Sequence, residues 1–297
     1  MSATAVVLMA YGSPDRIEDV PAYYVDIRGA RPIRPELLED LVSRYRRLGI
    51  EQSNPLNEIT EATRAGLEAE LGLPVFTGMR HWQPRIAEAA DRAIQGGAET
   101  IVGLVLAPHY SSLSIEKYRA LLRDAVEGRA ELRFVERWGD DLGFIELLVE
   151  RLAAVRDEAS HVVFTAHSLP ARIIQAGDPY VDELNATAEA VAGRAALGAW
   201  SFSFQSESPT GEPWLGPDIL DHLDELAAQG VRDVVICPVG FVADHLEIKW
   251  DLDTEAAERA HELGLELRRI EMPNADPALV RVLAGLVQRA ASVPSST

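Results

Sequence analysis

Five side chains that could bind a cation or move a proton are gathered in the segment CPVGFVADHLEIKWDLD (237–253) and just beyond it. They are Asp244, His245, Glu247, Asp251 and Glu255. If the stretch is helical, Glu247, Asp251 and Glu255 stand at i, i+4 and i+8 and form one acidic stripe. Like charges at that spacing repel, so the stripe destabilises the helix unless a cation lies beside it. The pattern indicates a cation-binding face; for Asp251 and Glu255, a solvated acidic face is the alternative.

A second candidate, His167, lies in FTAHSLP (164–170), where an apolar run ends at a turn containing Pro170. Imidazole titrates near neutrality, so it can accept a proton or bind a metal. The alternative is a core histidine bonded to a backbone carbonyl. A histidine and a carboxylate facing each other would suit proton abstraction or metal delivery. Ser168 is a poor candidate for a nucleophile, because its surroundings do not read GxSxG.

The elements that must position these residues are short β-rich runs separated by amphipathic stretches. The candidate strands are residues 5–10, 74–78, 100–107, 132–136, 161–166, 200–205, 233–239 and 265–271. Strands that are apolar throughout are typical of parallel sheets covered on both faces. The alternation therefore predicts an α/β fold with parallel strands flanked by helices.

A faint internal repeat divides the chain in two. VVLMAYGSP (6–14) resembles VVFTAHSLP (162–170), and TIVGLVLAPHYSSLSIEKY (100–118) resembles DVVICPVGFVADHLEIKW (233–250). The repeat predicts two similar lobes, residues 1–147 and 148–297, with chance similarity between βα units as the alternative. Ligands of open α/β sheets bind beyond the carboxyl ends of the strands. We therefore expect Tyr11, His109, His167 and residues 244–255 to converge on one cleft.

The composition excludes several classes of protein. A net charge of −19 argues against a nucleic-acid binder and against docking on anionic lipid through a basic patch. The single cysteine, Cys237, allows no disulfide and no cysteine-ligated iron–sulfur cluster and fits a reducing cytoplasm. No segment is long and apolar enough for a signal peptide or an integral membrane span. The GxGxxG and GxxxxGKS/T phosphate loops are missing.

Residues 28–47 are locally basic in this acidic chain. The arginines in the segment and the tyrosines in or near it are Arg28, Arg31, Arg34, Arg44, Arg46, Arg47, Tyr23, Tyr24 and Tyr45. Together they could bind the carboxylates of a flat aromatic ligand. The alternative is an exposed helix whose arginines pair with Glu36, Glu39 and Asp40.

Motifs along nearly the whole chain resemble those of the ferrochelatases, which insert ferrous iron into a porphyrin. The matching stretches are LMAYGSP, YYVDIRGARP, SNPLNEIT, HWQP, LAPHYSSLSIEKY, TAHSLP, GDPY, FQSESPTGEPWLGP and PVGFVADHLEIKWDLD. The resemblance implies the chelatase fold: two Rossmann-like lobes with a porphyrin cleft between them. It is strongest to the short bacterial ferrochelatases that act on coproporphyrin III.

The resemblance also implies roles for individual residues. His167 and Glu247 match the family's catalytic histidine and carboxylate, which would also contact the metal. Asp251 and Glu255 match the outer members of a carboxylate row that guides a divalent ion inward or holds a hydrated Mg²⁺. The residues that match porphyrin contacts are Tyr11, Arg28, Arg44, Ser53 and Tyr118. Gly29 departs from the family's paired-arginine motif, which reads IRGAR here.

The resulting hypothesis is a cytoplasmic, monomeric coproporphyrin III ferrochelatase of heme biosynthesis. Ferrous iron is its substrate, no tightly bound cofactor is expected, and an enzyme that uses coproheme would be its downstream partner. The alternatives are a protoporphyrin IX ferrochelatase and a non-catalytic tetrapyrrole carrier that needs the cleft but not Glu247. A cobalt or sirohydrochlorin chelatase and an unrelated α/β hydrolase fit the motifs less well.

Overall fold

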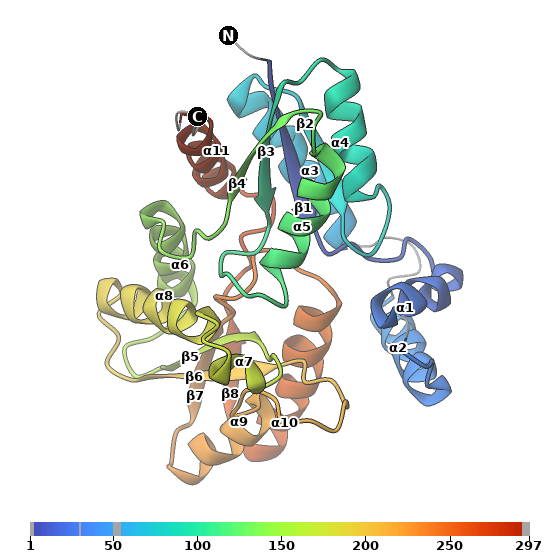
Figure 1. The fold of residues 1–297 in the computed structure, drawn as a ribbon. Coiled ribbons are helices and arrows are strands. Elements are labelled where there is room, and N and C mark those ends of the chain that lie inside the picture. The colour runs from blue at the N-terminus through green and yellow to red at the C-terminus, as the bar shows by residue number, and fades with distance from the viewer. Residues whose placement is uncertain (1–2, 30, 50–54, 293–297) are drawn as a thin grey trace.

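The computed structural model describes residues 3–29, 31–49 and 55–292. They form two four-stranded parallel sheets, one above the other in Figure 1, each with helices on both faces. The strands are β1 Thr4–Ala10, β2 Val75–Met79, β3 Thr100–Val105, β4 Glu131–Val135, β5 His161–His167, β6 Trp200–Gln205, β7 Asp233–Cys237 and β8 Glu266–Arg269. All eight predicted strands are present, and the predicted α/β fold is confirmed.

The two sheets have the same topology. Their strand orders are β2-β1-β3-β4 and β6-β5-β7-β8, so in each the first strand along the chain lies between the second and the third. All pairings are parallel; Val6 lies opposite Val75 in one sheet and Val162 opposite Trp200 in the other. The faint sequence repeat therefore corresponds to a repeated arrangement of strands.

Helices cover both faces of each sheet. Their bounds are α1 Val20–Arg28, α2 Pro35–Arg47, α3 Pro55–Leu71, α4 Ile86–Gln95, α5 Ile115–Val126, α6 Leu142–Val155, α7 Arg172–Gln175, α8 Tyr180–Arg194, α9 Ile219–Ala228, α10 Ala257–Leu263 and α11 Pro277–Ser292, with a 3₁₀ turn η1 at Ile17–Asp19 and a π-helix η2 at Ile248–Ala256. In β1, Val6 and Leu8 join the core under α3 and α11, whereas Val7 and Met9 join the core under α4 and α5. Both sides of the strand are buried, which explains why its sequence is apolar throughout.

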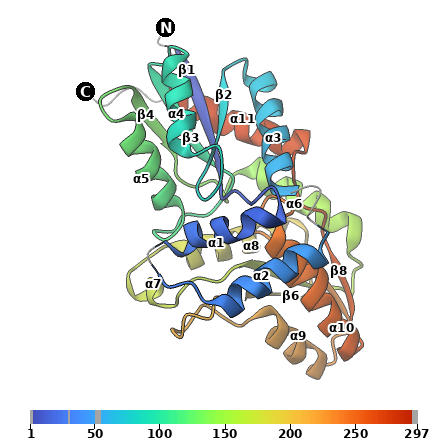
Figure 2. The same cartoon turned by 90° about the vertical axis from the view of Figure 1, so that its right-hand side faces the viewer.

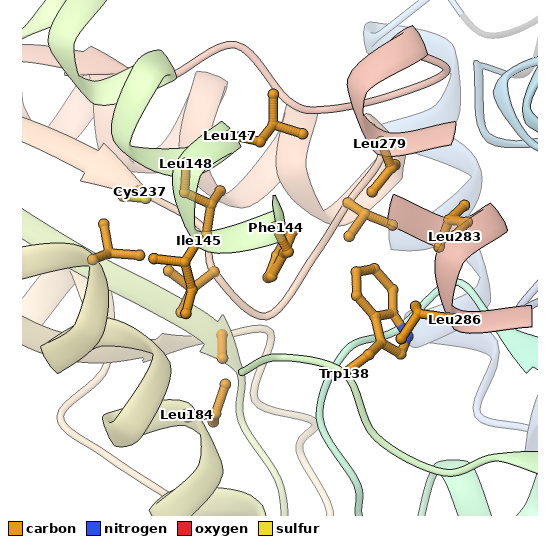
Figure 3. Packing of buried hydrophobic residues seen from close by; sticks show 14 of the residues in the cluster. Trp138, Phe144, Ile145, Leu147, Leu148, Leu184, Cys237, Leu279, Leu283 and Leu286 are labelled. Carbon is orange, nitrogen blue, oxygen red and sulfur yellow. The ribbon is translucent and has the colours of Figure 1, made fainter. Parts of the chain in front are cut away.

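The largest core is shared by the two lobes. It runs from Leu8 of β1 through Trp138 to Phe164 of β5. Trp138 and Phe144 meet edge to face, with ring centroids 5.0 Å apart, close to the leucines of α11 (Figure 3). Truncating a fully buried aromatic side chain of this kind costs about 3–5 kcal/mol, so this junction is a large contribution to stability.

Two segments, α11 and the pair α1–α2, pack against the lobe that does not contain their neighbours in sequence. The predicted boundary between residues 147 and 148 lies within α6. From the C-terminal half of the chain, α11 packs against α3 and against β4 of the N-terminal sheet. Conversely, α1 and α2 follow β1 in sequence but lie beside the C-terminal lobe (Figure 2). Arg34 donates to the Pro209 carbonyl at 3.0 Å. The division at residue 147 stays a prediction, and the lobes are joined by exchanged helices.

Candidate functional site

The ends of two neighbouring strands bring His167 and Glu247 together. His167 is the last residue of β5, one residue further than predicted, and Glu247 follows the loop after β7 and directly precedes η2. The His167 Nε2 atom lies 3.6 Å from Glu247 Oε1. The loop can approach β5 because Gly240 lies against Ala166; a Cβ at Gly240 would stand 2.6 Å from the Ala166 Cβ.

Glu247 lies between two imidazoles. His245 Nε2 is 3.3 Å from Glu247 Oε2, and His245 Nδ1 is 2.8 Å from the Ala243 carbonyl oxygen. On the other side, His167 Nδ1 is bonded to the Ser168 carbonyl, and the Tyr180 hydroxyl donates to the His167 carbonyl at 3.0 Å. The sequence placed His245 in the polar cluster but gave it no role; here it is the second neighbour of the carboxylate.

The pair is charged at neutral pH. Desolvation opposes the charge on His167, but the Glu247 carboxylate outweighs it and raises the pKa of His167 to about 9. Desolvation likewise opposes the charge on Glu247, yet His167 and His245 hold the pKa of Glu247 well below its usual range. The side chains of His167 and Glu247 remain 31% and 37% exposed. Both side chains are therefore partly withdrawn from water and still accessible.

Phenols from several elements surround this carboxylate. Burial, and after it the Glu247 charge, raises the pKa of Tyr11 and of Tyr180 well above the usual range. Burial also raises the pKa of Tyr118; the Arg80 guanidinium, 5.4 Å from the centre of its ring, partly opposes this effect. Tyr11 keeps 39% of its surface exposed. The N-terminal lobe therefore presents an accessible phenol within electrostatic reach of Glu247.

The acidic stripe begins at Glu247, directly before η2, and continues through Asp251 and Glu255 on that π-helix, a rare element that is frequent at functional sites. Asp251 is only 7% exposed, so it is not part of a solvated face, whereas Glu255 is half-buried. Burial, Glu247 and Glu255 raise the pKa of Asp251 to about 6, although Ser206 donates to it and Arg44 lies 3.8 Å away. Among the described residues, no three His, Cys, Asp or Glu side chains are grouped closely enough to hold a metal ion.

The predicted porphyrin contacts fall into two groups. Tyr11, Tyr118 and Arg44 lie around Glu247 and Asp251; Arg44 also bonds Asp40 at 2.8 Å and covers the Trp250 ring. Arg28 lies at the end of α1, where it donates to the Pro32 carbonyl at 3.0 Å. Ser53 lies outside the described residues.

His109 does not belong to this group, so the expectation that four strand ends converge on one ligand is wrong for it. It is 3% exposed and its Nε2 atom is 2.8 Å from the Thr187 hydroxyl of α8. Burial lowers the pKa of His109 to about 3. The neighbouring Tyr110 amide donates to Glu183 of the same helix at 2.8 Å. This strand end therefore fastens the two lobes to each other.

The family model for ferrochelatase matches residues 3–291. The chain belongs to the ferrochelatase family. It is a metal chelatase of the lyase class, and the family resemblance predicted from the motifs is confirmed. Across the described residues of this ferrochelatase, none of the helices has the length and apolar character needed to cross a membrane.

Several relatives align with this chain over almost the whole length of both proteins. A ferrochelatase of Herpetosiphon aurantiacus is 43% identical, with 97% of this chain and 99% of the relative aligned. A coproporphyrin III ferrochelatase of Geobacillus kaustophilus is 37% identical, with 95% and 94% aligned. The structure of SirB from Bacillus subtilis with Fe³⁺ has a TM-score of 0.65 over 98% of this chain and 96% of SirB, at 12% identity. That likeness shows the shared two-lobe fold.

Proposed function

We propose that this ferrochelatase inserts ferrous iron into coproporphyrin III and releases Fe-coproporphyrin III, or coproheme. The observation that carries the proposal is the His167–Glu247 pair, 3.6 Å apart and accessible, with the Tyr11 phenol of the other lobe within electrostatic reach of Glu247. In the reaction, one Fe²⁺ replaces two pyrrole protons, so the site must accept two protons and attract a divalent cation. An imidazole and a carboxylate side by side offer both functions.

The charged state of the pair suggests an order of events. With its pKa raised to about 9, His167 carries a proton at neutral pH and cannot accept another. An Fe²⁺ ion arriving beside Glu247 repels that proton into the surrounding water, because like charges disfavour the protonated form. The neutral imidazole can then take one pyrrole proton, and the Glu247 carboxylate offers a route to solvent for the second. Bending of the macrocycle by the surrounding phenols would expose a nitrogen lone pair.

We choose coproporphyrin over protoporphyrin because of the propionate carboxylates of the substrate. Coproporphyrin III carries four propionates, and an arginine can bind each through two parallel hydrogen bonds. Arg28, Arg44, Ser53 and Tyr118 are the proposed contacts. The coproporphyrin III ferrochelatase of Geobacillus kaustophilus supports this choice. We also assign Asp251 and Glu255 as the outer carboxylates that draw in Fe²⁺ or hold a hydrated Mg²⁺.

The deciding measurement is anaerobic iron insertion, followed as loss of porphyrin fluorescence with Fe(II) and either coproporphyrin III or protoporphyrin IX. We expect rapid loss with coproporphyrin III and slow loss with protoporphyrin IX. The reverse preference would overturn the substrate assignment and keep the chelatase. Binding of both porphyrins with insertion into neither would favour the non-catalytic carrier, which should also keep its porphyrin affinity in Glu247→Gln.

The compartment, the oligomeric state and the downstream partner of the enzyme are also proposed. We place the enzyme in the cytoplasm as a monomer that passes coproheme to a downstream enzyme. The single cysteine, Cys237, has no second cysteine with which to form a disulfide, and this supports a reducing compartment. A single species of 32.5 kDa in light scattering is the expected result; a dimer would contradict this part.

A further inference from the structure

A fully buried amide, Gln205, contacts both catalytic strand ends. It is the last residue of β6 and 0% exposed. Its main chain lies opposite His167 in the sheet register, and its carbonyl accepts the Ser168 amide at 2.7 Å. Its side-chain Nε2 donates to the main-chain carbonyl of Glu247 at 3.4 Å. One residue therefore connects the strand that carries His167 with the loop that carries Glu247.

The orientation of this amide is set by a second buried group. The Thr165 hydroxyl donates to Gln205 Oε1 at 3.0 Å, and Thr165 is also 0% exposed. Because the oxygen is occupied by a donor, the amide nitrogen must face Glu247. A buried amide that loses one partner leaves an unsatisfied polar group, so the arrangement strongly resists rotation. Thr165 and Gln205 thus form one directed chain ending at Glu247.

The next residue continues the same alignment. Ser206 has φ +66°, a left-handed conformation that is uncommon for a residue with a side chain. Its hydroxyl donates to Asp251 of η2. Strained backbone of this kind persists where the surrounding structure enforces it, commonly beside functional sites. Gln205 and Ser206, at the end of β6, are therefore bonded to Glu247 and Asp251, two successive members of the acidic stripe.

We propose that Gln205 is a positioning residue that sets the separation of His167 and Glu247 for metal insertion. The expected loss of insertion rate rests on the proposed function. The expected change in the His167–Glu247 separation rests on the hydrogen-bond geometry alone. Gln205 itself need not touch porphyrin or iron. It acts through the main chain of Glu247, so its loss displaces the carboxylate without removing it.

The kinetic test compares Gln205→Leu and Thr165→Val with the conservative Thr165→Ser. Misplacing a catalytic group by about 1 Å can cost about 100-fold in rate. We expect Gln205→Leu to lose about 100-fold in kcat with an unchanged KM for coproporphyrin III. Thr165→Val should lose less, and Thr165→Ser, which keeps the hydroxyl, should restore the wild-type kcat.

Ser203→Ala is the matched control. Ser203 lies on the same strand, is 0% exposed and donates to the Pro217 carbonyl at 2.9 Å. Its loss should lower Tm by a few degrees, as loss of one buried hydrogen bond does, and leave kcat unchanged. Equal losses of kcat in Ser203→Ala and Thr165→Val would overturn the proposal, since general loosening would then explain both.

Crystal structures of the wild type and Gln205→Leu separate this proposal from the proposed function. We expect the His167–Glu247 separation to widen clearly beyond 3.6 Å in the variant. An unchanged separation would refute the positioning role, whatever the kinetics show. If the wild type inserts iron into neither porphyrin, the proposed function fails, and the measured separation still decides the role of Gln205.

Discussion

Histidines stand near the strand ends of both sheets, and the two lobes use them in opposite ways. His109, which follows β3, is buried against α8 with its pKa lowered to about 3. His167, which ends β5, is accessible beside Glu247 with its pKa raised to about 9. The two sheets share one strand order, in which β5 is the counterpart of β1, and β3 is the counterpart of β7. The two histidines therefore differ in their place in the topology and in what their side chains face: His109 joins the lobes, and His167 lies beside the carboxylate.

The sharpest way to break this comparison is to remove each histidine in turn. We expect His167→Ala to lower kcat by about 100- to 10,000-fold, the range supplied by a positioned acid–base group, while porphyrin still binds. His109→Gln should keep kcat and lose stability. Anaerobic insertion kinetics and porphyrin fluorescence titration measure both. Wild-type turnover in His167→Ala would remove His167 from the mechanism.

Two tightly packed glycines offer a similar contrast with a smaller effect. A Cβ at Gly240 would stand 2.9 Å from the Ala166 Cα, next to His167. A Cβ at Gly103, in β3, would meet the side-chain ends of Leu122 and Phe134 at 2.6 and 2.8 Å. We expect Gly240→Ala to lower kcat about tenfold or more, because the Glu247 loop must shift.

Gly103→Ala is the control for this prediction. It should cost about 1–3 kcal/mol of stability through overpacking and leave kcat unchanged. Stopped-flow insertion rates and urea unfolding curves give the two readouts. If both substitutions lower kcat equally, the close approach at Gly240 has no special part in forming the site.

His109 and His167 should also make the free energy of unfolding depend on pH in opposite directions. Between pH 6.5 and 3 the unfolded chain binds a proton at His109 that the native protein does not, so this contribution is lost as pH falls; at pH 5 the loss is about 2 kcal/mol. His167 binds its proton more tightly in the native state. Its contribution is complete below pH 6.5 and is lost as pH rises through about 9.

Urea unfolding at a series of pH values tests these slopes. His109→Gln should flatten the decline on the acid side, and His167→Ala should flatten the decline on the alkaline side. Wild-type slopes in both variants would show that neither imidazole is perturbed as described.

Much of the fold was predictable, because strands buried on both faces leave long apolar runs such as TIVGLVLA. The pairing of His167 with the 244–255 segment was accessible through motif spacing. The burial of His109 was not, since its partner Thr187 lies on a distant helix of the other lobe. Arg80 and Tyr180 carried no spacing signal. Positions i, i+4 and i+8 suit an α-helix as well as the π-helix observed, and no local pattern shows that α11 packs on the first sheet.

The position of α11 has a consequence for biosynthesis. The N-terminal sheet leaves the ribosome with one face covered only in part, by α3, and α11, which completes the cover, ends only at Ser292. At the usual pace of translation, the interval after β4 lasts on the order of ten seconds. During that time the apolar side chains of β1 and β3 are open to chaperones or to aggregation. The nascent chain thus depends on a late helix to complete its earliest core.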